Sequence, residues 1–328
     1  MKAVVHDTFG EPSEVLEARD VALPIPGPGE VRIRTLLSPI HNHDIWTVRG
    51  QYGYRPTLPG AIGGSEAAGI IDTVGDGVDV GLVGRRVAVA GVHGTWAEQF
   101  IAPAAGVLPL PEAVSDEMAA QLISMPFSAI SLLDVLKAER GDWVIQTAAN
   151  GAVGRVMVVL AQARGIHLLN LVRRDEAAAE LRQAGVTHVL STSAGNWKDQ
   201  ARALIGAGRA VSAIDSVGGE ISADLIDLLA PDGELFVFGT ATGAPMTLSS
   251  GPLILKQIAI KGFWGSRVSA EMDPDKRKRL ITELVTLAAQ GELSLDTGGV
   301  FALDQIKKAV AASLTPGRAG KVMLKPWP

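Results

Sequence analysis

The segment from Val144 to Arg174 carries residues suited to hold a phosphorylated ligand. Its turn, Ala149-Asn150-Gly151-Ala152-Val153-Gly154, stands between an apolar run and a helical pattern that leads into a second apolar run. The turn reads A-x-G-x-x-G, with Ala149 where the dinucleotide fingerprint usually has its first glycine. Gly151 allows the backbone to approach a pyrophosphate, Gly154 allows the helix to pack closely on the strand, and free N–H groups at the helix start face the phosphate charge. The pattern predicts a strand–turn–helix–strand unit that binds a dinucleotide; a tight turn in another kind of α/β protein is the alternative.

Two arginines indicate which dinucleotide is bound. A site for NADH places a carboxylate about 20 residues after the turn, where it accepts from the ribose 2′-hydroxyl. Here Arg173 stands 19 residues after Gly154, and Arg174 follows it. Guanidinium groups bind a 2′-phosphate through charge-assisted hydrogen bonds, which predicts NADPH as the cofactor. Asp175 and Glu176 come next, and they either begin the following helix or pair with the arginines.

The composition excludes several classes of function. The chain has 328 residues, which suits two domains, and a net charge of −5 without a basic block, which argues against nucleic acid as a partner. No apolar run reaches the roughly 18 residues of a membrane span. The absence of cysteine excludes disulfides, thiolate nucleophiles and Cys-ligated zinc. The first residues, MKAVVHDTFG, lack the pattern of a secretory signal, so we expect a cytoplasmic protein.

Two patterns of secondary structure follow each other along the chain. Residues 1–100 hold short β-type runs separated by Gly and Pro, which favours an antiparallel β domain with barrel-like closure. After Pro111, helices and strands alternate, which predicts a doubly wound parallel sheet. We expect helices at 112–122, 128–137, 153–164, 176–184, 196–206, 219–229, 276–290 and 303–313, and strands at 144–148, 167–172, 187–191, 211–216, 233–239, 257–262 and 321–324. The segment past Gly262 returns to the first domain.

This order of motifs resembles the medium-chain dehydrogenase/reductase superfamily over essentially the whole chain. The motifs are GEVRIR, Asp44 in a loop after the first strands, GSEAAGIIDTVG, GRRVAV, AANGAVG, DSVGG and GKVML. Within the superfamily the chain is most similar to the zinc-free quinone reductases and 2-enoyl thioester reductases. The latter carry a Tyr after an I-x-G loop, an AAN-x-x-VG turn, arginines that close the second strand, and a G-F-W segment. Their counterparts here are Tyr52, AANGAVG, Arg173-Arg174 and Phe263-Trp264.

The resemblance implies the fold and the domains. We expect an α/β protein with a Rossmann domain for NADPH at residues 119–263 and a discontinuous, mainly β, GroES-like catalytic domain at 1–118 and 264–328. The apolar run at 257–262 would be an exposed sheet edge that needs cover, so we expect a homodimer, with a tetramer left open.

The resemblance also implies site residues outside the turn. Beyond residues 149–154 and the two arginines, the expected cofactor contacts are Phe238, Gly239, Phe263, Trp264 and Lys321, and the expected wall of the substrate pocket is Trp46, Tyr54 and Trp264. For the tryptophans the alternative is a place in the core, and for Lys321 it is a solvated strand end.

His41 and His43 raise the question of a metal. Zinc-dependent members have a Cys at the position of His41, and a His where this chain has Ser65 in Gly64-Ser65-Glu66. Alternate residues of an extended strand share a face, and imidazole binds zinc well, so a His/His/Asp or His/Glu site is an alternative. We expect no metal. His41 then stands where the zinc-free branch has Asn, and it donates a hydrogen bond towards the nicotinamide end of the cofactor.

Without zinc to polarise an oxygen, conjugate reduction is the accessible chemistry. Hydride passes from NADPH to an activated C=C or to a quinone, and the negative charge that develops on the carbonyl oxygen needs a donor. The chain has only two tyrosines, Tyr52 and Tyr54, in one loop. The resemblance assigns proton donation to Tyr52, with Tyr54 as the other possible donor and packing on the cofactor as the alternative for either ring. We expect His41 as the second catalytic residue.

We therefore expect a zinc-independent, NADPH-dependent oxidoreductase. Its substrate would be a small molecule, either an enoyl thioester or enone, or a quinone. The alternatives are a zinc-dependent alcohol dehydrogenase and a non-catalytic NADPH-binding sensor protein.

Overall fold

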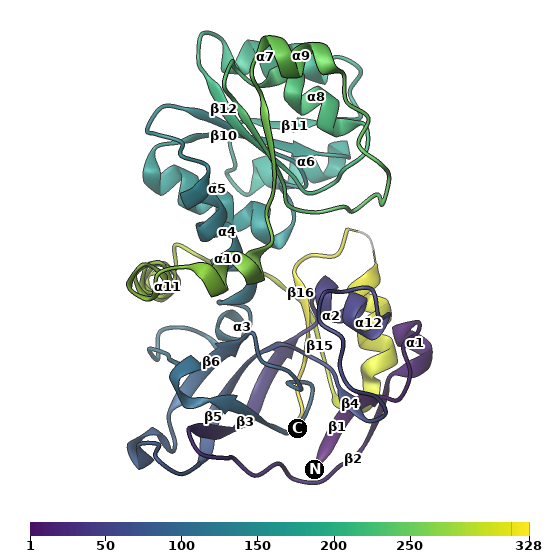
Figure 1. The fold of residues 1–328 in the computed structure, drawn as a ribbon, viewed down its shortest axis with the longest axis vertical. Helices are drawn as coiled ribbons and strands as arrows, with labels where there is room; N and C mark the ends of the chain where they lie inside the picture. The colour runs from purple at the N-terminus through teal and green to yellow at the C-terminus, as the bar shows by residue number, and fades with distance from the viewer. Residues whose placement is uncertain (316, 328) are drawn as a thin grey trace. The chain divides into compact units, whose positions relative to one another are not determined.

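The structure is a computed structural model that describes residues 1–315 and 317–327. It separates into two compact units (Figure 1). Unit 1 comprises residues 1–127 and 281–328, and unit 2 comprises residues 128–280. Both divisions fall inside helices, α4 (Ser124–Val135) and α11 (Pro274–Ala289), later in the chain than the expected boundaries at 118 and 263. Because the helical sequence pattern continues across each division, it gives no sign of where one unit ends and the next begins.

Unit 2 is built on a parallel sheet with the strand order β11-β10-β9-β12-β13-β14. The strands are β9 (Trp143–Gln146), β10 (His167–Val172), β11 (Val189–Ser191), β12 (Ala210–Asp215), β13 (Glu234–Val237) and β14 (Ala259–Gly262). The helices between and after them are α5 (Ala152–Arg164), α6 (Asp175–Gln183), α7 (Trp197–Ile205), α8 (Ile221–Leu228), α9 (Ser250–Leu255) and α10 (Gly265–Glu271). The order reverses between β9 and β12, as in the predicted doubly wound fold, and ligands of such sheets bind at the carboxyl ends of the strands at this point.

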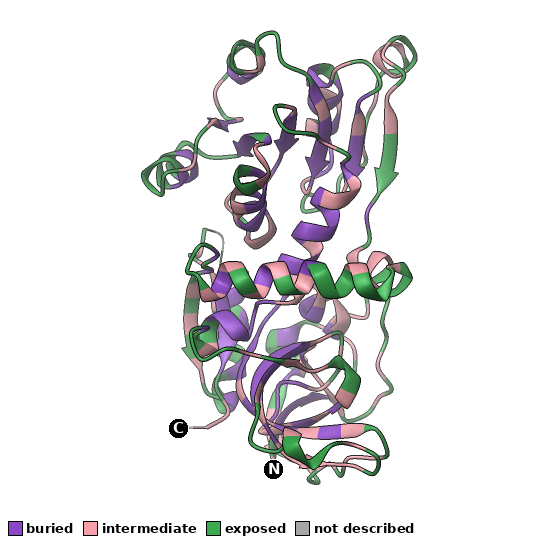
Figure 2. Cartoon of the chain, turned by 90° about the vertical axis from the view of Figure 1, so that its left-hand side faces the viewer, coloured by how far each residue is buried: buried purple, intermediate pink, exposed green. Residues whose placement is uncertain are grey.

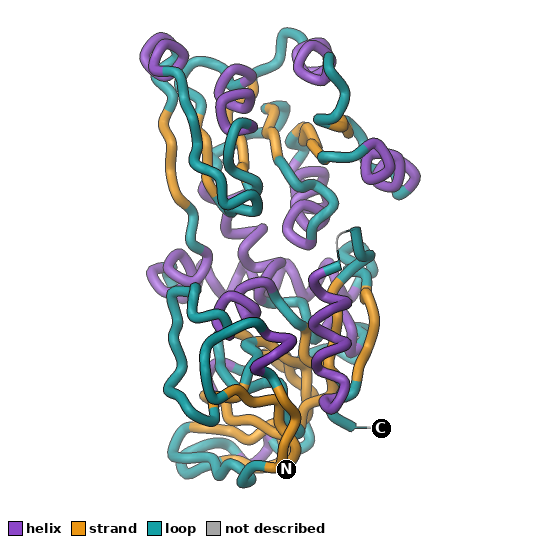
Figure 3. The backbone as a smooth tube through the Cα atoms, turned by 90° about the vertical axis from the view of Figure 1, so that its right-hand side faces the viewer, coloured by secondary structure: helices purple, strands orange, loops and turns teal. Residues whose placement is uncertain are grey.

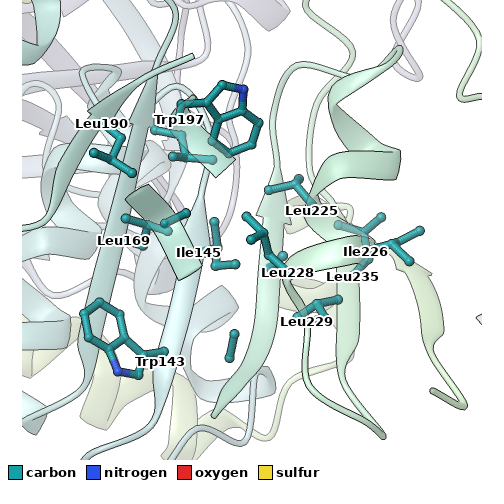
Figure 4. Packing of buried hydrophobic residues seen from close by; sticks show 14 residues of the cluster. Trp143, Ile145, Leu169, Leu190, Trp197, Leu225, Ile226, Leu228, Leu229 and Leu235 are labelled. Carbon is teal, nitrogen blue, oxygen red and sulfur yellow. The ribbon is translucent and has the colours of Figure 1, made fainter. Parts of the chain in front are cut away.

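The core of unit 2 lies between its strands and helices. Ile145 of β9, Leu169 of β10, Trp197 of α7 and Leu225 of α8 belong to one buried cluster (Figure 4). Apart from the edge strand β14, the strands are buried through most of their length (Figure 2) because helices cover both faces of a doubly wound sheet. This packing holds the strand ends, and the turns that leave them, in place.

Unit 1 is mainly β-structure, as expected, and is shown as a tube in Figure 3. One sheet has the order β15-β16-β3-β5-β6-β8, with β7 also paired to β3, and a second sheet has the order β2-β1-β4. The strands are β1 (Lys2–His6), β2 (Glu17–Asp20), β3 (Glu30–Pro39), β4 (Ala61–Ile62), β5 (Glu66–Val74), β6 (Arg86–Ala90), β7 (Gln99–Pro103), β8 (Leu108–Pro109), β15 (Thr297–Phe301) and β16 (Lys321–Leu324). An isolated bridge joins Ala3 of β1 to Ala97, two residues before β7.

The C-terminal segment completes unit 1. Its strand β16 pairs antiparallel with β3, with Met323 opposite Pro39. The short helices of the unit are α1 (Pro12–Val15), α2 (Asn42–Val48), α3 (Asp116–Ala119) and α12 (Ile306–Leu314). The predicted fold class, a parallel α/β domain beside a discontinuous β domain, is confirmed. No helix in the described ranges combines the length and the apolar character that crossing a membrane requires.

Several local expectations are wrong. The helix expected at 112–122 is the single turn α3, which begins only after Ser115, whose hydroxyl accepts from the N–H of Met118. The strand expected at 257–262 starts at Ala259, because Gln257 adopts a left-handed conformation with φ of 53°. Asp44 lies in helix α2 and not in a loop. Its carboxylate accepts the N–H of His41 at 2.9 Å, which closes the first turn of a helix where an extended strand was expected.

Candidate active site

The turn at 149–154 links β9 to α5 as predicted. A Cβ added to Gly154 would lie 2.5 Å from the carbonyl oxygen of Ala149, so glycine is required for the helix to start this close to the strand. Ala149 is fully buried, and its N–H donates to the carbonyl of Leu171 in β10 at 3.1 Å. The N–H groups of the first turn of α5 have no carbonyl partners within the helix. The turn therefore fits the pyrophosphate of a dinucleotide.

Two buried amides beneath the turn were not predicted. The Nε2 group of Gln146 donates to the carbonyl of Gly154 at 3.0 Å and to Oδ1 of Asn170 at 2.7 Å. Asn170 in turn donates to the carbonyls of Leu168 and Thr187, each at 3.0 Å. These bonds tie the turn to the neighbouring strand β10. The sequence feature that could have indicated this pair is a polar amide inside each of two apolar runs, VIQT and LLNL.

Arg173 and Arg174 directly follow β10, and both are exposed. Neither guanidinium pairs with a carboxylate of the described residues. Asp175 begins α6 and accepts the hydroxyl of Ser193 at 3.1 Å, and Glu176 lies in the same first turn. The two acidic residues therefore start the next helix, and the arginines are free to bind an anionic group. Their exposed position allows contact with a 2′-phosphate, and that contact stays a prediction.

Asp215, at the end of β12, organises the loop carrying the DSVGG motif. Its Oδ1 accepts the N–H groups of Val217 at 2.9 Å and Gly218 at 3.0 Å. Its carbonyl oxygen accepts the N–H groups of Phe238 at 2.8 Å and Gly239 at 3.1 Å. One buried carboxylate residue thus positions two loops at the carboxyl edge of the sheet.

The other cofactor residues expected in unit 2 lie near this edge. The ring of Phe238 is 5.8 Å from that of Phe263, which follows β14 and is buried. Trp264 is 52% exposed, so the alternative that it belongs to the core is wrong. The structure brings Phe238, Gly239, Phe263 and Trp264 to the ends of two adjacent strands, and their contacts with a cofactor stay predictions.

Three rings stack in unit 1. The ring centroids of His41 and His43 are 4.8 Å apart with 14° between the ring planes. Those of His43 and Tyr52 are 5.6 Å apart at 27°. The loop carrying Tyr52 turns back on α2 because Gly50 adopts a left-handed φ of 71°, and Gln51 donates its N–H to the carbonyl of Trp46 at 2.8 Å. We call His41, His43 and Tyr52 the ring stack.

A directed chain of hydrogen bonds holds His43. The hydroxyl of Ser65 donates to Oδ1 of Asp44 at 2.6 Å. Since that proton is committed, the 2.7 Å bond between Nε2 of His43 and the Ser65 oxygen has the imidazole as its donor. Asp44 is itself buried, and its other oxygen accepts the N–H of His41. In the sequence, Ser65 was noted only because it replaces a zinc-binding histidine, and this chain of hydrogen bonds was not predicted.

His41 and Glu66 form a fully buried pair, with 2.7 Å between Nε2 and Oε2. Burial raises the pKa of Glu66 to about 8 and lowers the pKa of His41 well below its usual value. At neutral pH the protonated carboxyl group donates to Nε2 of His41, which places the ring hydrogen on Nδ1. Nδ1 has no partner in the described part of the chain and is the atom left for the predicted bond towards the cofactor, which stays a prediction.

Below pH 4.5, where the carboxyl group of Glu66 is protonated, we expect Glu66→Gln to have nearly the wild-type free energy of unfolding and Glu66→Leu to lose about 2–4 kcal/mol of it. The other carboxyl oxygen of Glu66 accepts the N–H groups of Ile123 and Ser124, each at 2.8 Å. A glutamine amide can make these bonds and still donate to His41, whereas leucine can make none of the three. Urea unfolding of the two variants measures the difference.

The contribution of Glu66 to the free energy of unfolding depends on pH in a defined way. Because folding raises the pKa of Glu66 from 4.5 to about 8, its contribution to stability is fully present below pH 4.5 and is lost as the pH rises towards 8. The unfolding free energy of the wild type minus that of Glu66→Gln should therefore fall over this range. A difference that rises with pH would show that Glu66 is ionised in the folded protein.

The remaining expected site residues of unit 1 lie in different surroundings. Lys321 is only 7% exposed in β16, so the alternative of a solvated strand end is wrong, and burial lowers its pKa to about 8. Tyr54 is 38% exposed and its ring stacks on His93, with centroids 3.6 Å apart. Trp46 is half-buried on α2. Their roles towards cofactor and substrate stay predictions.

The stacking of the two histidines argues against their sharing one zinc ion, and the expected absence of a metal stays a prediction. Imidazole rings that lie nearly parallel direct their nitrogen lone pairs along parallel planes, whereas one tetrahedral ion needs converging ligands. In addition, Nε2 of His41 is bonded to Glu66 and Nε2 of His43 to Ser65. Within residues 1–315 and 317–327, no group of three or more His, Cys, Asp or Glu side chains is arranged around a possible metal position.

Comparison with known proteins gives matches over both units. The alcohol dehydrogenase GroES-like domain matches residues 27–112, and the zinc-binding dehydrogenase family matches residues 152–282. The chain is 30% identical to the mitochondrial enoyl-[acyl-carrier-protein] reductase of Rattus norvegicus over 322 residues, which cover 96% of this chain and 86% of the relative. Because that relative is mitochondrial, the cytoplasmic location stays a prediction.

Solved structures share the fold over nearly the whole chain. A protein assigned as an NADPH:quinone reductase from Bacillus thuringiensis superposes with a TM-score of 0.92 at 27% identity, covering 99% of both chains. A second protein with this assignment, from Mesorhizobium loti, gives a TM-score of 0.86 at 30% identity, covering 99% of this chain and 98% of that one.

Proposed function

We propose, because the chain belongs to the medium-chain dehydrogenase/reductase superfamily, that it is an NADPH-dependent reductase of 2-enoyl thioesters that works without zinc. The observation that carries this proposal is Tyr52. Its place in the sequence resembles that of the enoyl reductase tyrosine, which follows an I-x-G loop, and its ring stacks on His43. The curated relative is named for enoyl reduction, which supports the same substrate class. Enones share the activated C=C. Quinones are the second candidate, since two of the similar solved structures are assigned as quinone reductases.

The residues present fit NADPH. The turn at 149–154 would hold the pyrophosphate through the N–H groups of α5, and Arg173 and Arg174 would hold the 2′-phosphate. When bound, NADPH supplies the hydride for the β-carbon of the substrate. Asp215 fixes the conformation of the neighbouring loops through its hydrogen bonds. Nδ1 of His41 would donate a hydrogen bond to the nicotinamide end of the cofactor.

Tyr52 performs the protein's part of the proton chemistry. Charge develops on the thioester carbonyl oxygen as the C=C accepts hydride, and a phenol donor stabilises that oxyanion. The hydroxyl of Tyr52 donates a hydrogen bond to this oxygen and gives its proton to the enolate, and that proton ends on the α-carbon of the saturated thioester. The tyrosinate that remains regains a proton from water. Among the described residues the contact of Tyr52 is made by its ring, which leaves the hydroxyl available for substrate. No Lewis acid is needed for this reduction.

We include a homodimer in the proposal. Strand β14 is an edge of the parallel sheet, and Ile260 on it is 37% exposed. Nearby in the sequence, Ile254 and Leu255 of α9 are 65% and 85% exposed. An apolar edge of this kind is usually covered, and pairing with the same strand of a second copy would cover it.

The proposal is tested by steady-state NADPH oxidation with crotonyl thioester, an enone and a quinone, each with and without chelator. We expect turnover of the thioester, unchanged by chelation. Oxidation of a simple alcohol with NADP⁺ that is lost with chelator would instead indicate a zinc alcohol dehydrogenase. Tight NADPH binding without turnover of any substrate would indicate a sensor protein.

A further inference from the structure

The geometry of His43 has a consequence for Tyr52, the proposed proton donor. Tyr52 lies in the segment 51–60, which has no helix or strand, and its side chain is only half-buried. Its neighbour Tyr54 is oriented by a different imidazole, that of His93. Within the described residues the aromatic contact of Tyr52 is with His43, at 5.6 Å between centroids. The direction of the phenol therefore depends on the plane of that imidazole.

The plane of the His43 ring is set from two sides. An imidazole N–H donates in the plane of its ring, and Nε2 of His43 points at the Ser65 oxygen, whose own proton is committed to Asp44. The ring also stacks on His41, which is fully buried and bonded to Glu66. Rotation of the His43 ring would break the bond to Ser65 and the stacking on His41 and Tyr52.

We propose that His43 is a positioning residue for Tyr52, acting through the ring stack, with Asp44 and Ser65 fixing its orientation. This inference rests on the proposed role of Tyr52 in enoyl reduction. His43 moves no proton to substrate in this scheme. Its ring is the surface on which the phenol lies, so that the hydroxyl is held in one direction before substrate arrives. Displacement of a reacting group by about 1 Å costs up to roughly 10²-fold in rate, which sets the scale of the effect.

A double-mutant cycle tests the inference in the full-length protein. His43→Ala should lower kcat for crotonyl thioester by about 10- to 100-fold with NADPH affinity unchanged. In the Tyr52→Phe background the same substitution should change kcat by less than about threefold, because no hydroxyl is left to misplace. Equal losses in both backgrounds, or no loss in the wild type, would overturn the inference. If Tyr52→Phe alone leaves kcat unchanged, the proposed role of Tyr52 has failed instead.

A measurement without turnover tests the stacking itself. The chain has only two tyrosines, so ring-¹³C-tyrosine gives two sets of NMR signals, which Tyr54→Phe assigns. His43→Ala should remove the ring-current shift of the Tyr52 signals, and Ser65→Ala, which keeps the imidazole, should shift and broaden them. His93→Ala is the matched control and should move only the Tyr54 signals. Tyr52 signals that are unchanged in both His43→Ala and Ser65→Ala would refute the positioning role, even if one variant were inactive for another reason.

Discussion

Replacing Tyr52 by phenylalanine is expected to lower kcat for an enoyl thioester by about 10²–10³-fold while NADPH affinity stays the same. The substitution keeps the ring on His43 and removes only the hydroxyl, the donor to the developing oxyanion. Quinone reduction should suffer less, because a quinone accepts hydride readily and its oxygen can take a proton from water. Stopped-flow and steady-state rates on both substrate types measure the difference.

Tyr54→Phe is the matched control for this prediction. Its ring stacks on His93, so the loss of that hydroxyl should leave the chemical step intact. If Tyr54→Phe is inactive and Tyr52→Phe is active, the two tyrosines have exchanged roles. If both variants stay active on every substrate, the tyrosines are packing residues, and backbone groups or His41 must hold the enolate.

Replacing both Arg173 and Arg174 by glutamine is expected to weaken NADPH binding by one to several decades and to leave NADH binding nearly unchanged. Both guanidinium groups are exposed at the end of β10, and neither is engaged by a carboxylate of the described residues. Each charge-assisted bond to a phosphate contributes roughly 1.5–3 kcal/mol, and each 1.4 kcal/mol corresponds to about tenfold in affinity. Fluorescence titration with the two dinucleotides measures the selectivity.

Arg209→Gln serves as the control for the loss of a positive charge elsewhere on the same unit. Arg209 is exposed and precedes β12, so it lies at the amino end of a parallel strand, opposite the edge where ligands bind. The loss of the Arg209 guanidinium should change neither the affinity for NADPH nor the affinity for NADH. Equal weakening of NADPH and NADH in the double variant would contradict the assignment, because a 2′-phosphate contact discriminates between the two cofactors.

The amino-acid sequence alone determined the architecture of the cofactor unit. Alternating apolar runs and helical patterns are local properties, and they predicted β9, α5 and β10 within a few residues. The requirement for glycine at position 154 could also be predicted from the sequence, because its close approach to Ala149 occurs within a single turn. Arg173 and Arg174 were found for the same reason, because their distance from the turn is set by the length of one helix and one strand.

The arrangement around Tyr52 depends on contacts between distant segments and could not be predicted from the sequence. Local pattern predicted an extended segment at His41–His43, but the carboxylate of Asp44 closes a helical turn there, and the two imidazoles stack. Glu66 reaches His41 from 25 positions away, and Lys321 is buried because β16 pairs with β3 at the other end of the chain. Such contacts depend on strand register and on which side chains share an interior. Those are set by packing between distant segments, so residue spacing along the chain does not contain them.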